Sequence, residues 1–293
     1  MNLTLQPDIL FAVLFTNTKI TFATNHGKLA AAYNAFEKTL KTEITELPID
    51  SDRFGTFSGE VDRDGSMLDA LRSKVALARE LTSERFILAS EGSFSTAGGF
   101  SLVAQNIELL MLSDLETGAE IVEQYITYET NYAAEVIKNL NVLDSFLARI
   151  SFGNHALVLY PGGLSPKHYV SKGIVDLAQA RKIFTEYSAL SPTASVMAMS
   201  DMRAHLNPTR MKAIQECCEL MARRLANKCP SCTSGGFGIV ATIPGLPCED
   251  CGAPTSLALS EKHNCPFCAF IKEYPRQDGK KFADPSVCQW CNP

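Results

Sequence analysis

The segment Cys229-Pro230-Ser231-Cys232 opens a C-terminal stretch in which cysteine decides the fold. Three more Cys-x-x-Cys pairs follow it, at Cys248/Cys251, Cys265/Cys268 and Cys288/Cys291. Two thiolates separated by two residues can bind one metal ion while the backbone turns beneath it, and two such pairs complete a tetrahedral site. The eight cysteines therefore predict two zinc ions in a module that spans residues 229–293.

The distribution of the cysteines favours metal over disulfides. No cysteine precedes Cys217, whereas a secreted disulfide scaffold spreads its bridges through a small, loop-rich chain. Iron–sulfur proteins more often use one condensed cysteine run than four separated pairs. Because cysteines alone supply all the ligands, we expect the zinc to be structural.

The sequence leaves the pairing of the four motifs open. Sequential pairing, first with second and third with fourth, leaves loops at residues 233–247 and 269–287 and is the preferred arrangement. Interleaved and nested pairings are the alternatives. Cys217 and Cys218 lie outside the motifs, and we expect them to be core residues because no histidine lies near them in sequence to form a redox or nucleophilic pair.

The composition is that of an ordinary globular protein. Of 293 residues, 46% are hydrophobic and 20% charged, and the formal net charge is −5. These values exclude a broadly basic, nucleic-acid-coating protein. The longest apolar run near the start, residues 9–15, is far shorter than the roughly 20 residues of a membrane span. No basic segment precedes this run, so a secretory signal is not expected and the predicted location is the cytoplasm.

Strand-like and helix-like patterns alternate along the first 200 residues. Segments rich in β-branched and aromatic residues predict strands at residues 9–15, 18–23, 42–48, 85–89, 107–112, 156–160 and 194–199. Apolar residues at helical spacing predict helices at residues 28–40, 69–81, 116–140 and 175–188, and residues 90–99 form a predicted polar loop. Strands that alternate with helices predict an α/β fold with a mainly parallel sheet and flanking helices.

The predicted organisation has three parts. Residues 1–200 form the α/β domain, residues 201–228 a connecting amphipathic helix, and residues 229–293 a zinc-ribbon-like module. Pro208 is expected in the first turn of the connecting helix, with Asn207 as its cap.

Two long motifs carry a resemblance to a known family. They are Met202-Arg203-Ala204-His205-Leu206-Asn207-Pro208-Thr209-Arg210-Met211, and Gly245-Leu246-Pro247-Cys248 with Cys251-Gly252-Ala253-Pro254-Thr255. They resemble an uncharacterised bacterial family that is known only as a domain of unknown function. Similar stretches at residues 25–28, 54–60 and 89–94 extend the resemblance over nearly the full length. It implies an architecture and supplies no activity.

A second, fainter resemblance rests on the N-terminal part. The loop Thr24-Asn25-His26-Gly27-Lys28 lies between a predicted strand and a predicted helix, residues 70–79 form a helix with Ala and Lys, and Glu91-Gly92 follows a strand. In this order the segments are similar to house-cleaning nucleotide pyrophosphatases of the inosine-triphosphatase type. The resemblance implies a nucleotide substrate and a metal-binding acid at Glu91.

The loop at residues 24–28 also suits a polyphosphate on physical grounds. Backbone N–H groups at a helix N-terminus attract an anion, Gly27 allows close approach, and Lys28 adds a positive charge. Asn25, Lys28 and Ser93 are therefore candidate ligand-binding residues. His26 is a candidate general acid or base, or a phosphate contact.

Carboxylates are the other half of a phosphate-handling site, because a divalent cation bridges them to phosphate oxygens. The candidates are Asp52, Glu60 and Glu91, each in a predicted Gly- or Ser-rich loop. We expect them to be catalytic residues that bind magnesium or manganese or activate water. Glu91 follows an apolar strand directly, and ligands collect at such strand ends in α/β sheets.

Two functions are consistent with these patterns. The first is a metal-dependent phosphohydrolase or nucleotide-binding protein with a structural zinc module. The alternative is a non-catalytic zinc-ribbon factor that binds nucleic acid or protein through the module and a locally basic connecting helix. The basic residues of that helix region are Arg203, Arg210, Lys212, Arg223, Arg224 and Lys228. Convergence of Lys28 and the acids in one cleft favours the first function, and scatter favours the second.

Overall fold

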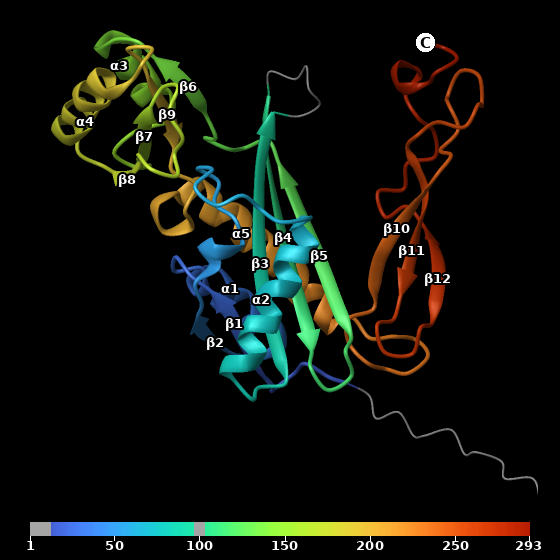
Figure 1. Cartoon of the computed structure of the whole chain (residues 1–293). Coiled ribbons are helices and arrows are strands. Elements are labelled where there is room, and N and C mark those ends of the chain that lie inside the picture. The colour runs from blue at the N-terminus through green and yellow to red at the C-terminus, as the bar shows by residue number, and fades with distance from the viewer. Residues whose placement is uncertain (1–12, 97–102) are drawn as a thin grey trace, which may run out of the picture. The chain divides into compact units, whose positions relative to one another are not determined.

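The computed structural model describes residues 13–96 and 103–293 of the chain (Figure 1). The chain divides into two compact units. One is Asn17–Ala222, and the other combines Arg223–Pro293 with Met1–Thr16, of which residues 13–16 are described. The division falls inside the long helix α5, Pro208–Ala226.

A five-stranded sheet lies at the centre of the unit Asn17–Ala222, and it is mixed. Its strands are β1 Lys19–Thr24, β2 Glu43–Pro48, β3 Phe86–Thr96, β4 Ala104–Asp114 and β5 Glu120–Thr127, in the order β2-β1-β3-β4-β5. β1 is parallel to β2 and β3, whereas β4 is antiparallel to β3 and β5. The prediction of a mainly parallel sheet is therefore wrong. The segments that join β3 to β4 and β4 to β5 are too short for the crossover that parallel strands need.

Helices α1 Leu29–Leu40 and α2 Met67–Leu81 flank this sheet (Figure 1). α2 begins at a capping box, in which the Ser66 side chain accepts a hydrogen bond from the Asp69 N–H and the Asp69 side chain accepts one from the Ser66 N–H. One face of α2 is buried on the sheet in a cluster formed by Ala23, Ile49, Leu71, Val75, Ala78, Ile87, Ala89 and Met111.

Helix α5 contacts the opposite face of the same sheet. Successive side chains of a strand point to opposite faces of the sheet, and Glu108 and Met111 are three positions apart on β4. Because Met111 packs on the α2 side, Glu108 lies on the other face. The Arg210 guanidinium of α5 binds Glu108, and the Cys217 thiol lies 3.5 Å from the Glu108 carbonyl oxygen. The Asn207 side chain accepts a hydrogen bond from the Arg210 N–H at 2.9 Å, which confirms the predicted cap.

A second, antiparallel sheet belongs to the same unit. Its strands are β6 Ala134–Ile137, β7 Leu157–Pro161, β8 Ser171–Ile174 and β9 Val196–Ser200, in the order β6-β9-β7-β8. Helices α3 Leu140–Arg149 and α4 Leu177–Leu190 cover it through Leu143, Phe146 and Phe184. Asn139 and Asp176 cap the two helices with their side chains.

The C-terminal unit contains a three-stranded antiparallel meander. Its strands are β10 Gly238–Pro244, β11 Ala258–Asn264 and β12 Ile271–Pro275. Residues before the first sheet belong to this unit, because the Val13 N–H donates to the Ser234 hydroxyl and the Phe15 and Phe267 rings lie 6.3 Å apart.

Three predicted elements need correction. Residues 116–140 are not a helix, because they hold β5, β6 and the segment between them. Residues 90–96 continue β3 instead of forming a loop, and residues 97–99 lie outside the described residues. Of the strand predicted at residues 9–15, the first four residues are not described and residues 13–15 lie in no strand. Among the helices that the structure describes, none has the length and apolar character needed to cross a membrane.

Candidate functional site

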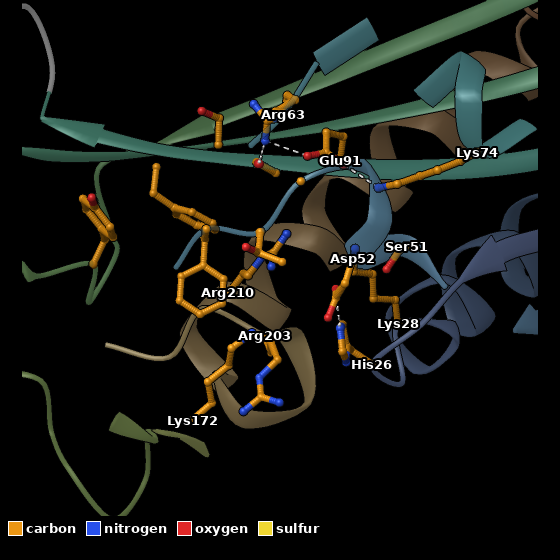
Figure 2. A pocket seen from close by; sticks show the side chains of 17 residues that line it. His26, Lys28, Ser51, Asp52, Arg63, Lys74, Glu91, Lys172, Arg203 and Arg210 are labelled. Atoms are coloured by element: carbon orange, nitrogen blue, oxygen red, sulfur yellow. Dashed lines mark hydrogen bonds and ion pairs between the residues drawn. The ribbon is translucent and has the colours of Figure 1, made fainter. Parts of the chain in front are cut away.

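A pocket of about 280 Å³ lies within the unit Asn17–Ala222, and its walls are strongly cationic (Figure 2). Six Lys and Arg side chains line it: Lys28, Arg63, Lys74, Lys172, Arg203 and Arg210. In the described part of the chain, only the carboxylates of Asp52 and Glu91 line it as well. Its volume is at the small end of ligand sites.

Five of the six cations have a carboxylate partner. The pairs are Arg63 with Glu91, Lys74 with Glu91, Lys172 with Glu60, Arg203 with Asp201 and Arg210 with Glu108. Glu91 serves two of these cations, so the five pairs use four carboxylates, and three of the four (Glu60, Asp201 and Glu108) are not among the residues that line the pocket. Burying charges in this way is tolerable because each is paired and hydrogen-bonded.

Lys28 is the exception. Its side chain is buried, and among the residues that the structure describes its ammonium group donates only to the Ser90 hydroxyl, at 3.0 Å. Burial, together with the nearby positive charges of Arg210 and Lys74, lowers the pKa of Lys28 to about 7. Lys28 is thus a cation of the pocket whose charge nothing in the described wall neutralises directly.

Glu91 connects two other cations. Its carboxylate accepts hydrogen bonds from Lys74 and, at 2.6 Å, from Arg63. Burial alone would raise the pKa of Glu91, but the charges of Lys74 and Arg63 hold that pKa below its usual value, so the carboxylate is ionised. Lys74 also donates to the Ser90 carbonyl oxygen, so α2 and β3 fix this group together.

Position 92 has no room for a side chain, because the Arg210 guanidinium lies against the Gly92 backbone. A Cβ atom at position 92 would lie 2.2 Å from Nη2 of Arg210 and 3.0 Å from Oε2 of Glu108. Arg210 is itself held by Glu108 and by the Met202 carbonyl oxygen, and it lies over the Phe94 ring. The Glu91-Gly92 sequence therefore places an anion on one side of β3 and leaves room for a buried ion pair on the other.

His26 and Asp52 form a second polar group of the pocket (Figure 2). Nε2 of His26 lies 3.4 Å from Oδ1 of Asp52, which belongs to the short helix η1, Ser51–Phe54. The hydrogen bond from His26 lowers the pKa of Asp52, although burial opposes that shift. The His26 ring stacks on His205 at a centroid distance of 5.0 Å.

The structure brings together four of the six predicted site residues. Lys28, Asp52, Glu91 and Ser93 line the pocket, whereas Asn25 and Glu60 do not. The Asn25 side chain accepts a hydrogen bond from the His26 N–H, and Glu60 binds Lys172 and the Ser58 hydroxyl. Asp52, Glu60 and Glu91 do not form a group spaced to share one metal ion, since only cysteines form such groups in the described part of the chain.

Sequence reasoning missed most of the cationic wall. No sequence motif pointed to Arg63 or Lys172, and Lys74 was noted only as a lysine within a predicted helix. Arg203 and Arg210 were placed on a basic helix face, but both line the pocket and both have acidic partners. The basic residues of this region therefore do not form one exposed surface.

The C-terminal unit contains two cysteine tetrads. They are Cys229, Cys232, Cys265 and Cys268, and Cys248, Cys251, Cys288 and Cys291. The pairing is interleaved, so the preferred sequential pairing is wrong. The physical reason is the meander: Gly238 of β10 pairs with Asn264 of β11, which brings the residues before β10 beside those after β11.

The sulfur separations fit a tetrahedral metal site. Pairs of sulfur atoms within the tetrads lie 3.6 to 3.8 Å apart. Zn–S bonds of about 2.3 Å in a tetrahedron require S···S edges of about 3.8 Å, whereas a disulfide bond is about 2.05 Å long. Each tetrad can therefore hold a metal ion such as zinc.

The two tetrads differ in their surroundings. Cys229 and Cys265 of the first tetrad belong to a cluster with Phe237, against which further aromatic residues pack: Phe267, Phe270 and Tyr274. In the second tetrad Cys251 and Cys291 are exposed. Cys217 and Cys218 belong to neither tetrad and are fully buried, and burial raises the pKa of both thiols, in agreement with a core role.

Comparison with known proteins places the chain in a family without supplying an activity. No curated protein matches the chain. Residues 74–293 match the model of a family described as Domain of unknown function (DUF6671), and this span includes the long motifs at residues 202–211 and 245–255. The protein is thus a member of the DUF6671 family of domains of unknown function.

Proposed function

We propose that the cationic pocket binds a phosphate-containing ligand, and that the phosphate neutralises the charge of the Lys28 ammonium group. The observation that carries this proposal is the charge pattern of the wall. Among the residues that the structure describes, five cations have carboxylate partners, and Lys28 has only the hydroxyl group of Ser90. A buried cation without an anion is costly unless an anion arrives with a ligand.

The backbone around Lys28 supports an anion at this place. Lys28 is the N-cap residue of α1, and within residues 13–96 and 103–293 its side chain forms no capping hydrogen bond. Gly27 has a φ of 69°, which leaves the turn before the helix open to close approach. The N–H groups of Ala30 and Ala31 donate to the carbonyl oxygens of Gly27 and Lys28, so the Lys28 ammonium group is the donor that this turn offers to an anion. The positive end of the helix dipole favours a negative group at the same place.

The finer form of the proposal is a nucleotide phosphohydrolase that depends on magnesium or manganese. It is supported by Lys28, Asp52 and Glu91 lining one pocket. In this form Asp52 and Glu91 provide oxygen ligands or activate water, and Ser93 helps to orient the ligand. Asn25 and Glu60 act indirectly, through the His26 N–H and through Lys172. Because Glu91 is bound by Lys74 and Arg63, the divalent cation would come with the phosphates of the ligand. The two tetrads would hold structural zinc.

Calorimetric titration with inorganic pyrophosphate and with ATP, each with and without magnesium, tests the binding step. We expect Lys28→Met to weaken binding at least about tenfold, because a charge-assisted hydrogen bond contributes about 1.5–3 kcal/mol. Lys38→Met, on the exposed side of the same helix, is the matched control and should bind like the parent. No binding by the parent protein, or equal binding by Lys28→Met, contradicts the proposal.

A hydrolysis panel of standard and damaged nucleotides tests the catalytic step. We expect Lys28→Ala and Glu91→Gln to abolish turnover while the zinc content stays at the parent value. Circular dichroism controls for folding, since Glu91→Gln also removes a partner of Lys74. An inactive parent protein that still binds nucleotide would reduce the proposal to a binding function.

The second candidate is a non-catalytic binding module for nucleic acid or protein. The observation that favours it is apolar exposure beside the second tetrad: Trp290 is 79% exposed and Phe282 is 51% exposed. Trp290 is the single tryptophan of the chain, so its fluorescence reports on this surface directly. Quenching by a single-stranded oligonucleotide that weakens steeply with salt would identify nucleic acid as the partner.

A further inference from the structure

We infer that His26, oriented by Asp52, is the proton-transfer residue of the pocket and acts on a water molecule that attacks the phosphate. This inference rests on the proposed phosphate site and goes beyond it, because it assigns the acid–base chemistry. Both side chains line the pocket that also holds Lys28, so a phosphate bound there lies within the same cavity.

Asp52 fixes the protonation pattern of the imidazole. Its carboxylate is ionised, since the hydrogen bond from His26 lowers its pKa. An ionised carboxylate can only accept a hydrogen bond, so Nε2 of His26 carries the proton and Nδ1 keeps a lone pair. The 3.4 Å distance between Nε2 and Oδ1 is long, which is common for catalytic hydrogen bonds before a ligand binds.

The backbone holds His26 in an uncommon conformation. His26 has a φ of 65°, in the left-handed region that few non-glycine residues adopt and in which histidine, asparagine and aspartate are enriched. Of the described non-glycine residues with positive φ, His26 is the one that lines the pocket. The Asn25 side chain accepts the His26 N–H at 2.8 Å and supports this turn. Departures of this kind cluster at functional sites, because the surrounding structure must stabilise them.

His205 stacks on one face of the His26 ring. The two imidazoles lie nearly parallel, with 20° between their planes, and burial lowers the pKa of His205, so its ring tends to be neutral. Among the described titratable groups, Asp52 and His205 contact His26 directly. Arg203 acts on both of them through its charge, Lys172 acts on Asp52, and Asp201 acts on His205. This arrangement leaves one imidazole nitrogen for chemistry and uses the other for orientation.

The chemical step is hydrolysis of a phosphoric ester or anhydride. A water oxygen forms a bond to phosphorus while its proton passes to the lone pair of His26. The bond between phosphorus and the leaving oxygen breaks, and that oxygen keeps the electron pair. The imidazolium then returns its proton to the leaving group or to solvent, so the residue is regenerated.

The test compares His26→Asn with the parent on nucleoside triphosphates and on nitrophenyl phosphate, with magnesium. Asparagine tolerates the left-handed backbone, so this variant keeps the turn and removes the base. We expect kcat to fall about 10²- to 10⁴-fold, while the pyrophosphate Kd from calorimetry changes less than about threefold. His168→Gln, at an exposed position outside the pocket, is the control and should keep the parent turnover.

The kinetics of Asp52→Asn and Asp52→Glu distinguish orientation of His26 from a purely structural role of Asp52. An asparagine amide can present either its oxygen or its N–H to Nε2, so kcat should fall while the pyrophosphate Kd changes less than about threefold, and Asp52→Glu should restore part of kcat. Asp62→Asn, at an exposed partner of Lys167, should keep the parent kcat. A parent that binds pyrophosphate but has no turnover, or a His26→Asn variant with parent kcat, overturns this inference and leaves the phosphate site standing. A parent that binds no phosphate ligand overturns the proposed function and this inference together.

Discussion

The pocket and the cysteine tetrads each bring side chains of like charge together, and they differ in what balances that charge. In each tetrad four cysteine sulfur atoms converge, and a bound metal ion would balance the negative charge of their thiolate forms. In the pocket six cations converge, and the chain supplies a carboxylate to five of them. We therefore expect the tetrads to need a metal ion for their stability, whereas the chain itself balances the charges of the pocket except at Lys28.

Metal removal is the strongest test of this difference. We expect close to two zinc ions per chain, and a strong chelator should unfold the C-terminal unit, because structural zinc contributes about 10–16 kcal/mol of folding free energy per site. Pyrophosphate binding by the pocket should change less than about twofold. Metal analysis, amide exchange and calorimetry on the same sample measure all three quantities.

Single serine substitutions test each cysteine tetrad separately. Cys265→Ser and Cys251→Ser should each lose one zinc equivalent, and Cys265→Ser should destabilise the unit more because an aromatic cluster surrounds the first tetrad. Cys217→Ala removes a buried thiol outside the tetrads and should retain two equivalents. A protein with no zinc, or one with iron and visible absorbance, would refute the zinc assignment.

Gly92→Ala should break the preformed part of the pocket. The new Cβ would displace Arg210 from Glu108, which is 2% exposed, and an unpaired buried charge costs about 3–5 kcal/mol. Thermal and urea unfolding measure this loss, and phosphate binding should weaken as Arg210 moves. Gly118→Ala is the control, because open space surrounds that glycine and only its φ of 75° opposes a side chain, at about 1–2 kcal/mol. Equal losses in the two variants would show that Arg210 adapts freely.

The local parts of this fold were predictable because local chemistry specifies them. Helix α5 begins where Asn207 and Pro208 place it, and the Cys-x-x-Cys motifs mark every tetrad ligand. Residues 116–140 were misread because apolar residues of β5 such as Ile121, Val122 and Ile126 fit a helical stripe as well as a strand. Pairing with β4, a contact between segments, decided the outcome.

Sequence analysis identified only those pocket residues that belong to a local motif. The loop at residues 24–28 identified Lys28, and the strand end identified Glu91. Arg210 and Glu108 are separated by 102 positions in the chain, and no periodicity connects them. Likewise the interleaved pairing of the tetrads follows from the strand order β10-β11-β12, which motif spacing does not encode.

Lys28→Met and Lys74→Met should change stability in opposite directions. The pKa of Lys28 falls from 10.5 to about 7 on folding, so unfolding takes up a proton between these values, and the full cost of burying the amine is present at pH 7 and below. Lys28→Met should therefore stabilise the protein at pH 7 by about 1–3 kcal/mol after the loss of the Ser90 hydrogen bond, and the gain should vanish as pH approaches 10. Lys74→Met should destabilise it by about 3 kcal/mol, because Glu91 loses a buried partner. Urea unfolding from pH 6.5 to 10 tests both signs, and destabilisation by Lys28→Met would remove the contrast between paired and unpaired cations.

The smallest expected effect is a pH dependence of ligand affinity. This dependence distinguishes the contribution of Lys28 from that of the cations that have carboxylate partners. If an anion pairs with Lys28, the bound state raises its pKa above about 7, so binding takes up a proton. The affinity should then fall as pH rises from 7 toward the bound-state pKa, by up to about tenfold per pH unit. Inorganic sulfate is a suitable probe because it stays dianionic throughout this range, so only the protein titrates. In Lys28→Arg the charge is permanent and the slope should disappear, whereas Lys38→Arg should keep it. A parent protein whose sulfate affinity is constant between pH 6.5 and 8.5 would mean that the anion contacts only the cations that already have carboxylate partners.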